Sequence, residues 1–238
     1  MRVAVIAGSI SGGFRVARKI ESLPGVDVFV VACNVGKRRP LLRWSREILS
    51  ALKSLGWVAL ASKTYRYARE ARLVILHHPL DEATSIDCLR SLQCDIGLHA
   101  ANVIYREPVI SAFRLGILNA HIGILPKYRG RSVAEWSVLQ GDPTGVTVFF
   151  IDPGIDTGDC LVLREFVPSR GWRSVQALKN MLFRCDARLY RKALEALMSA
   201  ECSFESNDTA KGRRYYVMSR LLTRAVNQIL ATTLIAFG

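Results

Sequence analysis

The chain has few cysteines, a deficit of acidic residues and no long apolar run. Its six cysteines are scattered, with no C-x-x-C pair and no histidine at metal-ligand spacing. We therefore expect reduced thiols and no metal. No apolar stretch reaches the roughly 20 residues of a membrane span, and the run after Met1 is too short for the core of a signal peptide. These absences predict a cytoplasmic protein.

The acidic deficit leaves 33 Lys and Arg residues against 20 Asp and Glu residues, a net charge of +13. Such an excess attracts anions, which include nucleic acid, acidic lipid surfaces and phosphorylated metabolites. The charge by itself does not choose among them. Half of the residues are apolar and 22% are charged, which is the composition of a globular protein. A length of 238 residues suits one α/β domain with a small extension.

Aliphatic segments alternate with amphipathic ones in the first half of the chain. Four of them are predicted strands: Arg2–Ala7, Val26–Cys33, Leu73–Leu76 and Asp95–Ala101. Because helical patterns separate them, we expect a Rossmann-like α/β fold, a mostly parallel sheet with helices on both faces. The turn Gly8–Gly13 lacks G-x-G-x-x-G spacing, so it carries no dinucleotide fingerprint. It is a plain tight turn or, alternatively, a helix start that accepts a phosphate.

The second half of the chain predicts further elements and a separate end. A helix over Ser132–Gln140 opens with an apparent capping box, Ser132 and Glu135. Residues 1–200 are expected to form the main domain, and residues 201–238 a short C-terminal arm followed by an amphipathic helix. We expect that helix to pack on its own domain or in a homodimer. Peripheral contact with an acidic membrane surface is the alternative.

One stretch, Leu118–Gly158, concentrates the polar chemistry. Residues i and i+2 share a face of a strand, so Asn119 and His121 should point the same way. An amide can hold an oxyanion, and an imidazole can move a proton near neutral pH. Asp156 follows the next apolar run inside a turn sequence, and a hairpin-like return would bring its carboxylate to the ring. Taken singly, His121 is more typical of a structural or surface histidine, and Asp156 of a turn former.

This stretch resembles the signature of the folate-dependent formyltransferases. Four ordered motifs carry the resemblance: Asn119–His121 (NAH), Leu125–Gly130 (LPKYRG), Gly145–Val148 (GVTV) and Asp156–Gly158 (DTG). The resemblance implies an enzyme with a formyltransferase catalytic domain over residues 1–200. Such enzymes move a formyl group from the co-substrate 10-formyltetrahydrofolate to a primary amine, and no metal is implied.

The resemblance also assigns roles to residues. Asn119 and a protonated His121 would stabilise the formyl oxygen, and Asp156 would set the protonation state of His121. A folate pocket, formed largely by backbone groups, is implied around Tyr105, Ile124, Leu125, Pro126, Asp152 and Gly154.

The amine acceptor is expected to be a small molecule. An amino-sugar nucleotide is favoured because Ala134–Gly141 is similar to the sugar N-formyltransferases. Methionyl-tRNA is the alternative, suggested by the basic loop Gly36–Pro40, although tRNA-specific members usually carry a further C-terminal β-barrel domain. Glycinamide ribonucleotide is the third. A non-catalytic relative that binds RNA is the alternative from another class, and it would not need Asn119, His121 and Asp156 together.

Overall fold

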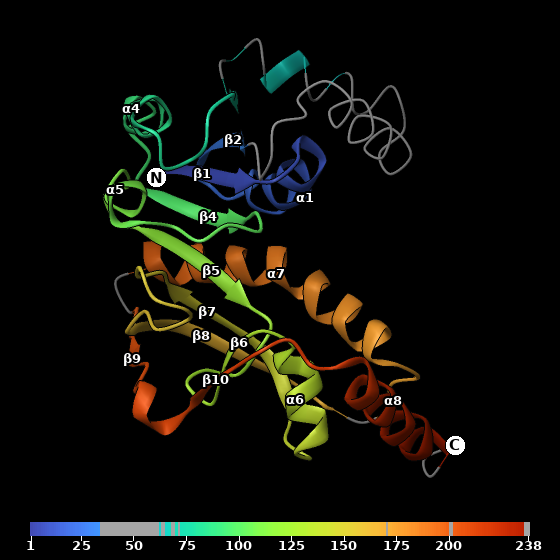
Figure 1. The fold of residues 1–238 in the computed structure, drawn as a ribbon. Helices are drawn as coiled ribbons and strands as arrows, with labels where there is room; N and C mark the ends of the chain where they lie inside the picture. Colours follow the sequence, from blue (N-terminus) through green and yellow to red (C-terminus); the bar gives the residue numbers. More distant parts are fainter. Residues whose placement is uncertain are drawn as a thin grey trace. The chain divides into compact units, whose positions relative to one another are not determined.

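A computed structural model describes residues 1–33, 62, 65–67, 70, 72–169, 171–199 and 202–235 of the chain. The chain divides into two compact units, unit 1 from Met1 to Leu118 and unit 2 from Asn119 to Gly238 (Figure 1). The basic loop Gly36–Pro40 lies outside the described residues. The predicted boundary between residues 200 and 201 is a different division of the chain, and it stays a prediction.

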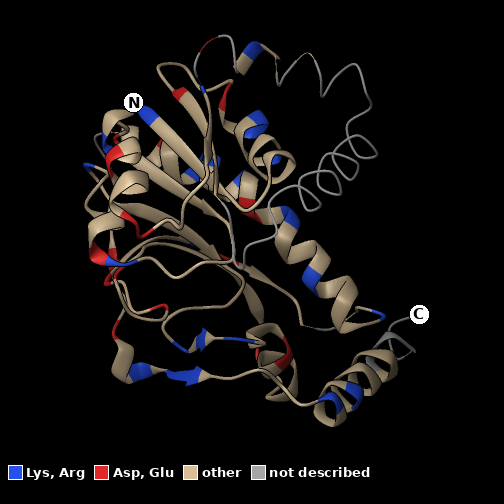
Figure 2. Cartoon of the chain, turned by 45° about the horizontal axis from the view of Figure 1, so that its top comes forward, with Lys and Arg blue, Asp and Glu red and all other residues tan. Residues whose placement is uncertain are grey.

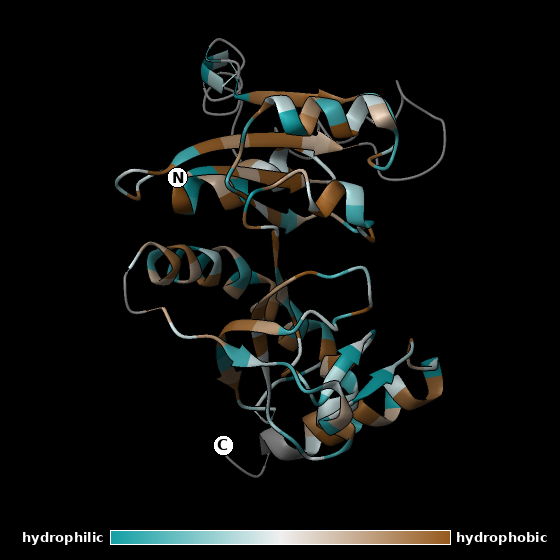
Figure 3. Cartoon of the chain, turned by 90° about the vertical axis from the view of Figure 1, so that its left-hand side faces the viewer, coloured by the Kyte–Doolittle hydropathy of each residue, from teal (hydrophilic) through white to brown (hydrophobic). Residues whose placement is uncertain are grey.

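Unit 1 is built on parallel strands in the order β3-β2-β1-β4-β5. The strands are β1 (Arg2–Ala7), β2 (Asp27–Cys33), β3 (Leu73–Leu76), β4 (Ile96–Ala100) and the start of β5 (Ile117–His121). The helices are α1 (Ile10–Ile20), α4 (Ala83–Ser91) and α5 (Glu107–Ile110). Most of the strand residues are buried and aliphatic (Figure 3), as parallel strands covered on both faces require. Val3 pairs with Val28 on one side and with Ile96 on the other.

Helix α1 begins at Ile10, four residues before the apolar spacing that starts at Phe14. The Ser9 hydroxyl accepts a hydrogen bond from the Gly12 N–H at 3.1 Å, which caps the first turn. A Cβ atom on Gly13 would lie 2.5 Å from Val30 Cγ1 of β2. Glycine at residue 13 therefore lets the helix approach the sheet closely. Because the segment Gly8–Gly13 has the composition of a turn, the sequence did not reveal that the helix begins within it.

Unit 2 holds the end of β5 in a mixed sheet of order β5-β7-β8-β9, in which β8 is antiparallel to both neighbours. A second, two-stranded sheet pairs β6 with β10 in parallel. The elements are β6 (Tyr128–Gly130), α6 (Val133–Leu139), β7 (Thr144–Phe150), β8 (Cys160–Val167), α7 (Val175–Met198), β9 (Glu205–Ser206), η1 (Thr209–Lys211), β10 (Arg213–Tyr215) and α8 (Arg220–Ile235). The predicted α/β class with a mostly parallel sheet is confirmed.

The predicted capping box of α6 is wrong. Ser132 precedes the helix, but its φ is +54° and its side chain makes no capping hydrogen bond. Its hydroxyl accepts a hydrogen bond from the Met218 N–H at 3.1 Å instead. Glu135 is buried and pairs with Lys179 at 2.9 Å. Both side chains thus serve tertiary contacts, and these outcompete the local motif.

The C-terminal helix α8 packs against α6 and α7 of its own unit (Figure 1). Val226 and Leu230 are fully buried, while Leu221 is 75% exposed. Asn227 accepts a hydrogen bond from the Val175 N–H at 2.9 Å, at the start of α7. Among the described residues, every helix is too short or too polar to cross a membrane.

Replacing Leu230 with alanine should therefore destabilise the protein, because the change leaves a cavity beneath α8. We expect a loss of about 2–5 kcal/mol in the free energy of unfolding, measured by urea denaturation. Leu221→Ala on the same helix is the matched control, with an expected change within about 0.5 kcal/mol. Equal losses in both variants would contradict the one-sided packing of α8.

Candidate functional site

The candidate site lies in unit 2 and begins at the end of β5. His121 is the last residue of this strand and is only 7% exposed, and Asn119 precedes it by two residues and is half-buried. Strand alternation places the two side chains on one face. The N–H of Ala120 donates to the Tyr190 hydroxyl of α7 at 2.9 Å. Helix α7 thereby anchors the end of the strand that carries the site.

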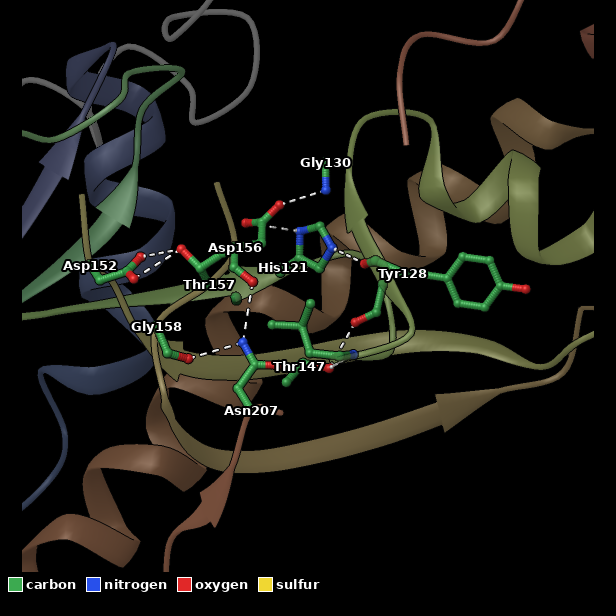
Figure 4. A network of polar contacts seen from close by, with 12 residues as sticks. His121, Tyr128, Gly130, Thr147, Asp152, Asp156, Thr157, Gly158 and Asn207 are labelled. Atoms are coloured by element: carbon green, nitrogen blue, oxygen red, sulfur yellow. Dashed lines mark hydrogen bonds and ion pairs between the residues drawn. The ribbon is translucent and has the colours of Figure 1, made fainter. Parts of the chain in front are cut away.

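Both nitrogens of the His121 ring face acceptors (Figure 4). Nε2 lies 2.8 Å from the Tyr128 carbonyl oxygen, which can only accept, so Nε2 carries a proton and donates it. Nδ1 lies 3.5 Å from Oδ1 of Asp156. A neutral ring would then turn a lone pair toward a carboxylate, whereas an imidazolium offers a proton to each acceptor. The ring thus lies between the Tyr128 carbonyl and the Asp156 carboxylate.

Asp156 sits in the loop between the antiparallel strands β7 and β8, as a hairpin-like return predicts. Its φ is +53°, in the left-handed region that costs most non-glycine residues about 1 kcal/mol or more. Its Oδ2 accepts a hydrogen bond from the Gly130 N–H at 2.8 Å. The backbone is held as well, because Nδ2 of Asn207 donates to the Asp156 carbonyl oxygen at 3.2 Å. The carboxylate is thus fixed beside the ring, and it is 13% exposed.

The segment after His121 is shaped by close contacts. A Cβ atom on Gly123 would lie 2.6 Å from His121 Nε2 and 2.9 Å from the Tyr128 carbonyl oxygen, so only glycine leaves room for their hydrogen bond. The hydroxyl of Thr147, fully buried on β7, donates to the Gly123 carbonyl oxygen at 2.7 Å. The same hydroxyl accepts from the Leu125 N–H at 3.1 Å. Thr147 thereby holds this segment on the sheet.

The far end of the loop is anchored at Tyr128. Its hydroxyl lies 2.7 Å from the side-chain oxygen of Gln140 and also contacts the Asp142 carboxylate, so its one proton lies between two acceptors. Burial, together with the hydrogen bond to Asp142, raises the pKa of the Tyr128 hydroxyl far above its usual range. Hydrogen bonds from Lys127 and Tyr128 hold the pKa of the Asp142 carboxyl below its ordinary value. Tyr128 therefore stays a neutral donor, and its carbonyl oxygen stays in place for His121.

The residues predicted to form a folate pocket differ from one another in burial and in their contacts. Leu125 is buried in a cluster with Phe149 and Leu161, and its carbonyl oxygen accepts from Arg164 at 3.1 Å. Its neighbours Ile124 and Pro126 are half-buried.

Two other members of the predicted pocket form one loop, and the last lies in unit 1. Asp152 closes its own loop, because Oδ1 accepts from the Thr157 hydroxyl at 2.8 Å and from the Gly154 N–H at 3.1 Å. Tyr105 is buried in unit 1, where its hydroxyl lies 2.9 Å from His99 Nδ1. Within the described residues, no group of three or more His, Cys, Asp or Glu side chains could hold a metal ion.

Sequence reasoning missed two residues of this site. Thr147 lies inside the GVTV motif, so the sequence drew attention to its position, but it could not show the two hydrogen bonds that its hydroxyl makes. Asn207 lies 51 residues beyond Asp156 and belongs to no motif. Nothing in the local sequence distinguishes it from an exposed loop residue.

Comparison with known proteins gives a consistent set of similarities. Residues 77–192 match the family model described as formyl transferase. Over 148 residues the chain is 31% identical to the methionyl-tRNA formyltransferase of Parabacteroides distasonis, an alignment that covers 61% of this chain and 45% of that protein. The similar protein of Agathobacter rectalis is 39% identical over 82 residues, 34% of this chain and 26% of that protein. The aligned part is thus less than half the length of these relatives.

Solved structures show the same fold at lower identity. A 4-N formyltransferase from Francisella tularensis superposes with a TM-score of 0.63 at 13% identity, covering 97% of this chain and 87% of that one. Phosphoribosylglycinamide formyltransferase from Streptococcus pneumoniae TIGR4 gives a TM-score of 0.57 at 22% identity, covering 83% and 99%.

Thr147→Val should destabilise the protein, because valine keeps the shape but leaves the Gly123 carbonyl and the Leu125 N–H buried and unpaired. We expect a loss of about 2–4 kcal/mol in the free energy of unfolding, measured with urea. Thr144→Val on the same strand is the matched control. The Thr144 hydroxyl is buried with no hydrogen-bond partner among the described residues, so its removal should be neutral or stabilising. A neutral Thr147→Val would contradict the assigned contacts.

Proposed function

We propose, from the membership of residues 77–192 in the formyl transferase family, that this chain transfers a formyl group from 10-formyltetrahydrofolate to a primary amine. The observation that carries the proposal is the contact between His121 and Asp156. An imidazole with one nitrogen fixed on a carbonyl and the other facing a carboxylate at 3.5 Å can be held as an imidazolium. Such a cation stabilises the negative charge that gathers during acyl transfer.

In the proposed reaction the amine attacks the formyl carbon, and negative charge gathers on the formyl oxygen. Asn119 and His121 stabilise this oxygen from the same face of β5. The Nδ1–H of His121 is free to donate because its 3.5 Å separation from Asp156 exceeds the roughly 2.7–2.9 Å of a full charge-assisted bond. The bond to the folate nitrogen then breaks as Asp156 helps the amine proton reach that nitrogen. Each oxyanion donor contributes on the order of 3 kcal/mol.

The folate pocket belongs to the same proposal. In unit 2 its members are Ile124, Leu125, Pro126, Asp152 and Gly154. The burial of the Leu125 side chain supports this assignment, because it anchors the segment in which the half-buried Ile124 and Pro126 lie on either side. The Asp152 loop is closed by its own hydrogen bonds and is therefore equally rigid. The assignment of Tyr105, which lies in unit 1, rests on the sequence resemblance.

For the acceptor we favour an amino-sugar nucleotide. The sequence Ala134–Gly141 supports it, as does the fold shared with a sugar N-formyltransferase from Shewanella, at a TM-score of 0.62 over 97% of this chain. Methionyl-tRNA is the second candidate, because the relatives from Parabacteroides distasonis and Agathobacter rectalis described above are named methionyl-tRNA formyltransferases. Exposed cations on the arm, Lys211, Arg213 and Arg214, suit the phosphates of either acceptor (Figure 2). Glycinamide ribonucleotide is the third candidate.

Two partner predictions remain for α8. Leu221, Leu222 and Ile229 are exposed on this helix, together with Arg220 and Arg224. Apolar side chains beside cations suit contact with a second copy of the chain or with an acidic membrane surface. Neither contact bears on the chemistry at His121.

His121→Ala and Asp156→Asn should each lower kcat/KM for formyl transfer by about 10² or more, since each removes charge from the reacting centre. Initial rates with 10-formyltetrahydrofolate measure this, and circular dichroism checks folding. His78→Ala is the matched histidine control, because the His78 side chain is exposed and pairs with Glu82, four residues along the chain. Both site variants within tenfold of the unmodified protein would overturn the mechanism.

The acceptor is tested by incubating the protein and 10-formyltetrahydrofolate separately with an aminodeoxysugar nucleotide, charged initiator tRNA and glycinamide ribonucleotide. Mass spectrometry should detect the added formyl group on the sugar nucleotide. A formylated methionyl-tRNA or glycinamide ribonucleotide alone would reassign the acceptor. RNA binding without any formyl product, with an affinity that falls steeply with salt, would favour the non-catalytic alternative.

A further inference from the structure

A side chain of the C-terminal arm forms hydrogen bonds with the loop that contains Asp156. Asn207 follows β9 and is only 3% exposed. Its Nδ2 donates to two carbonyl oxygens, that of Asp156 at 3.2 Å and that of Gly158 at 3.0 Å (Figure 4). Because both neighbours can only accept, the amide must point its NH₂ group at the loop. One carboxamide therefore spans the turn from residue 156 to residue 158.

Asn207 is itself held in place. Its N–H donates to the Asp159 carbonyl oxygen at 2.9 Å, and the neighbouring Ser206 hydroxyl donates to Asp159 Oδ1 at 2.9 Å. Strand β9 also pairs with β8 through Glu205 and Leu161. The backbone and the side chain of the arm thus bind the same loop at successive residues, so Asn207 has little freedom to follow a displaced loop.

The loop needs this support because of its backbone conformation. Asp156 is a non-glycine residue at a φ of +53°, and such residues persist only where the surroundings determine them. Gly158 cannot be replaced by a bulkier anchor, since a Cβ atom there would lie 1.8 Å from the Phe150 carbonyl oxygen. Asp152 closes the loop through Thr157 and Gly154, and the hydrogen bonds from Asn207 add a restraint on the carbonyl groups of residues 156 and 158 themselves.

The arm reaches the other side of the Asp156 carboxylate as well. The Gly130 N–H donates to that carboxylate at 2.8 Å, and Gly130 pairs with Tyr215 of β10. The Arg131 N–H donates to the Tyr215 carbonyl oxygen at 3.0 Å. A Cβ atom on Gly130 would lie 2.3 Å from the same oxygen, so the two strands are in close contact. Both groups that hold Asp156 are therefore tied to residues 205–215.

We infer that Asn207 is a positioning residue for Asp156 and that arm residues 205–215 complete the formyl-transfer site. This inference rests on the proposed function. By fixing the backbone of residue 156, the Asn207 carboxamide keeps Oδ1 facing His121 Nδ1 at 3.5 Å. Loss of the restraint lets the carboxylate turn away from the ring, and a misplacement of this kind costs up to about 10²-fold in rate.

The test uses the full chain with two substitutions and one matched control. Asn207→Ala removes the carboxamide, and Asn207→Asp keeps its size but turns a carboxylate toward two carbonyl oxygens. Asn227→Ala is the control, because Asn227 is another carboxamide of the C-terminal region that bonds a backbone N–H at 2.9 Å without contacting the Asp156 loop in any hydrogen bond described. Thermal unfolding reports stability in all three variants.

The expected kinetic result is a separation of kcat from KM. Both Asn207 variants should lower kcat by about 10- to 100-fold while the KM values for folate and amine change less than threefold, and Asn227→Ala should leave kcat unchanged at a similar loss of Tm. If the Asn207 variants keep the kcat of the control, the positioning role is overturned. A loss of stability alone cannot produce this pattern, because the Asn227→Ala control should lose a similar amount of stability and still keep its kcat.

A readout without turnover separates this inference from the proposed function. The chain has four histidines, so the ring resonances of His121 can be assigned by NMR with the His121→Ala variant. Asn207→Ala should move the His121 resonances, and Asn227→Ala should not. Unmoved resonances would overturn the inference even in an active enzyme. Moved resonances in a protein that formylates no acceptor would support the contact and reject the proposed function.

Discussion

The hydrogen bond from His121 Nε2 to the Tyr128 carbonyl oxygen, 2.8 Å long, decides which nitrogen of the ring faces Asp156. With Nε2 committed, only Nδ1 is available to the carboxylate and to a reacting group, so the ring has one orientation. This bond depends in turn on the absence of a side chain at residue 123 and on the anchoring of Tyr128. The local chemistry therefore rests on backbone geometry more than on the number of charged groups.

The structure supports the site from several elements of one unit. Strand β5 supplies His121, the loop between β7 and β8 supplies Asp156, and the segment from Tyr128 to Gly130 supplies the acceptor for one and the donor for the other. Helix α7 fixes the end of β5 through Tyr190. Arrangements of this kind hold catalytic groups on rigid elements and restrain the loop by hydrogen bonds from outside it.

Sequence reasoning succeeded where the information is local. The resemblance to the folate-dependent formyltransferases is confirmed, and so is the α/β fold with its mostly parallel sheet. The shared face of Asn119 and His121 stays a prediction from the fixed period of strand alternation. The return of Asp156 followed from two apolar runs joined by a turn. The capping box at Ser132 and Glu135 failed, because a local motif cannot reveal that Met218 and Lys179 take its side chains.

By itself the sequence determined the resemblance to the formyltransferases, the class of fold, the order of the strands along the chain and the three polar residues proposed for catalysis, because motif spacing and apolar periodicity are written locally. Only the tertiary structure decided that His121 Nδ1, and not Nε2, faces Asp156, and that Asn207 holds the loop. Contacts across 51 residues depend on how strands pair and how the arm returns. Those are properties of the packed chain, and no short stretch encodes them.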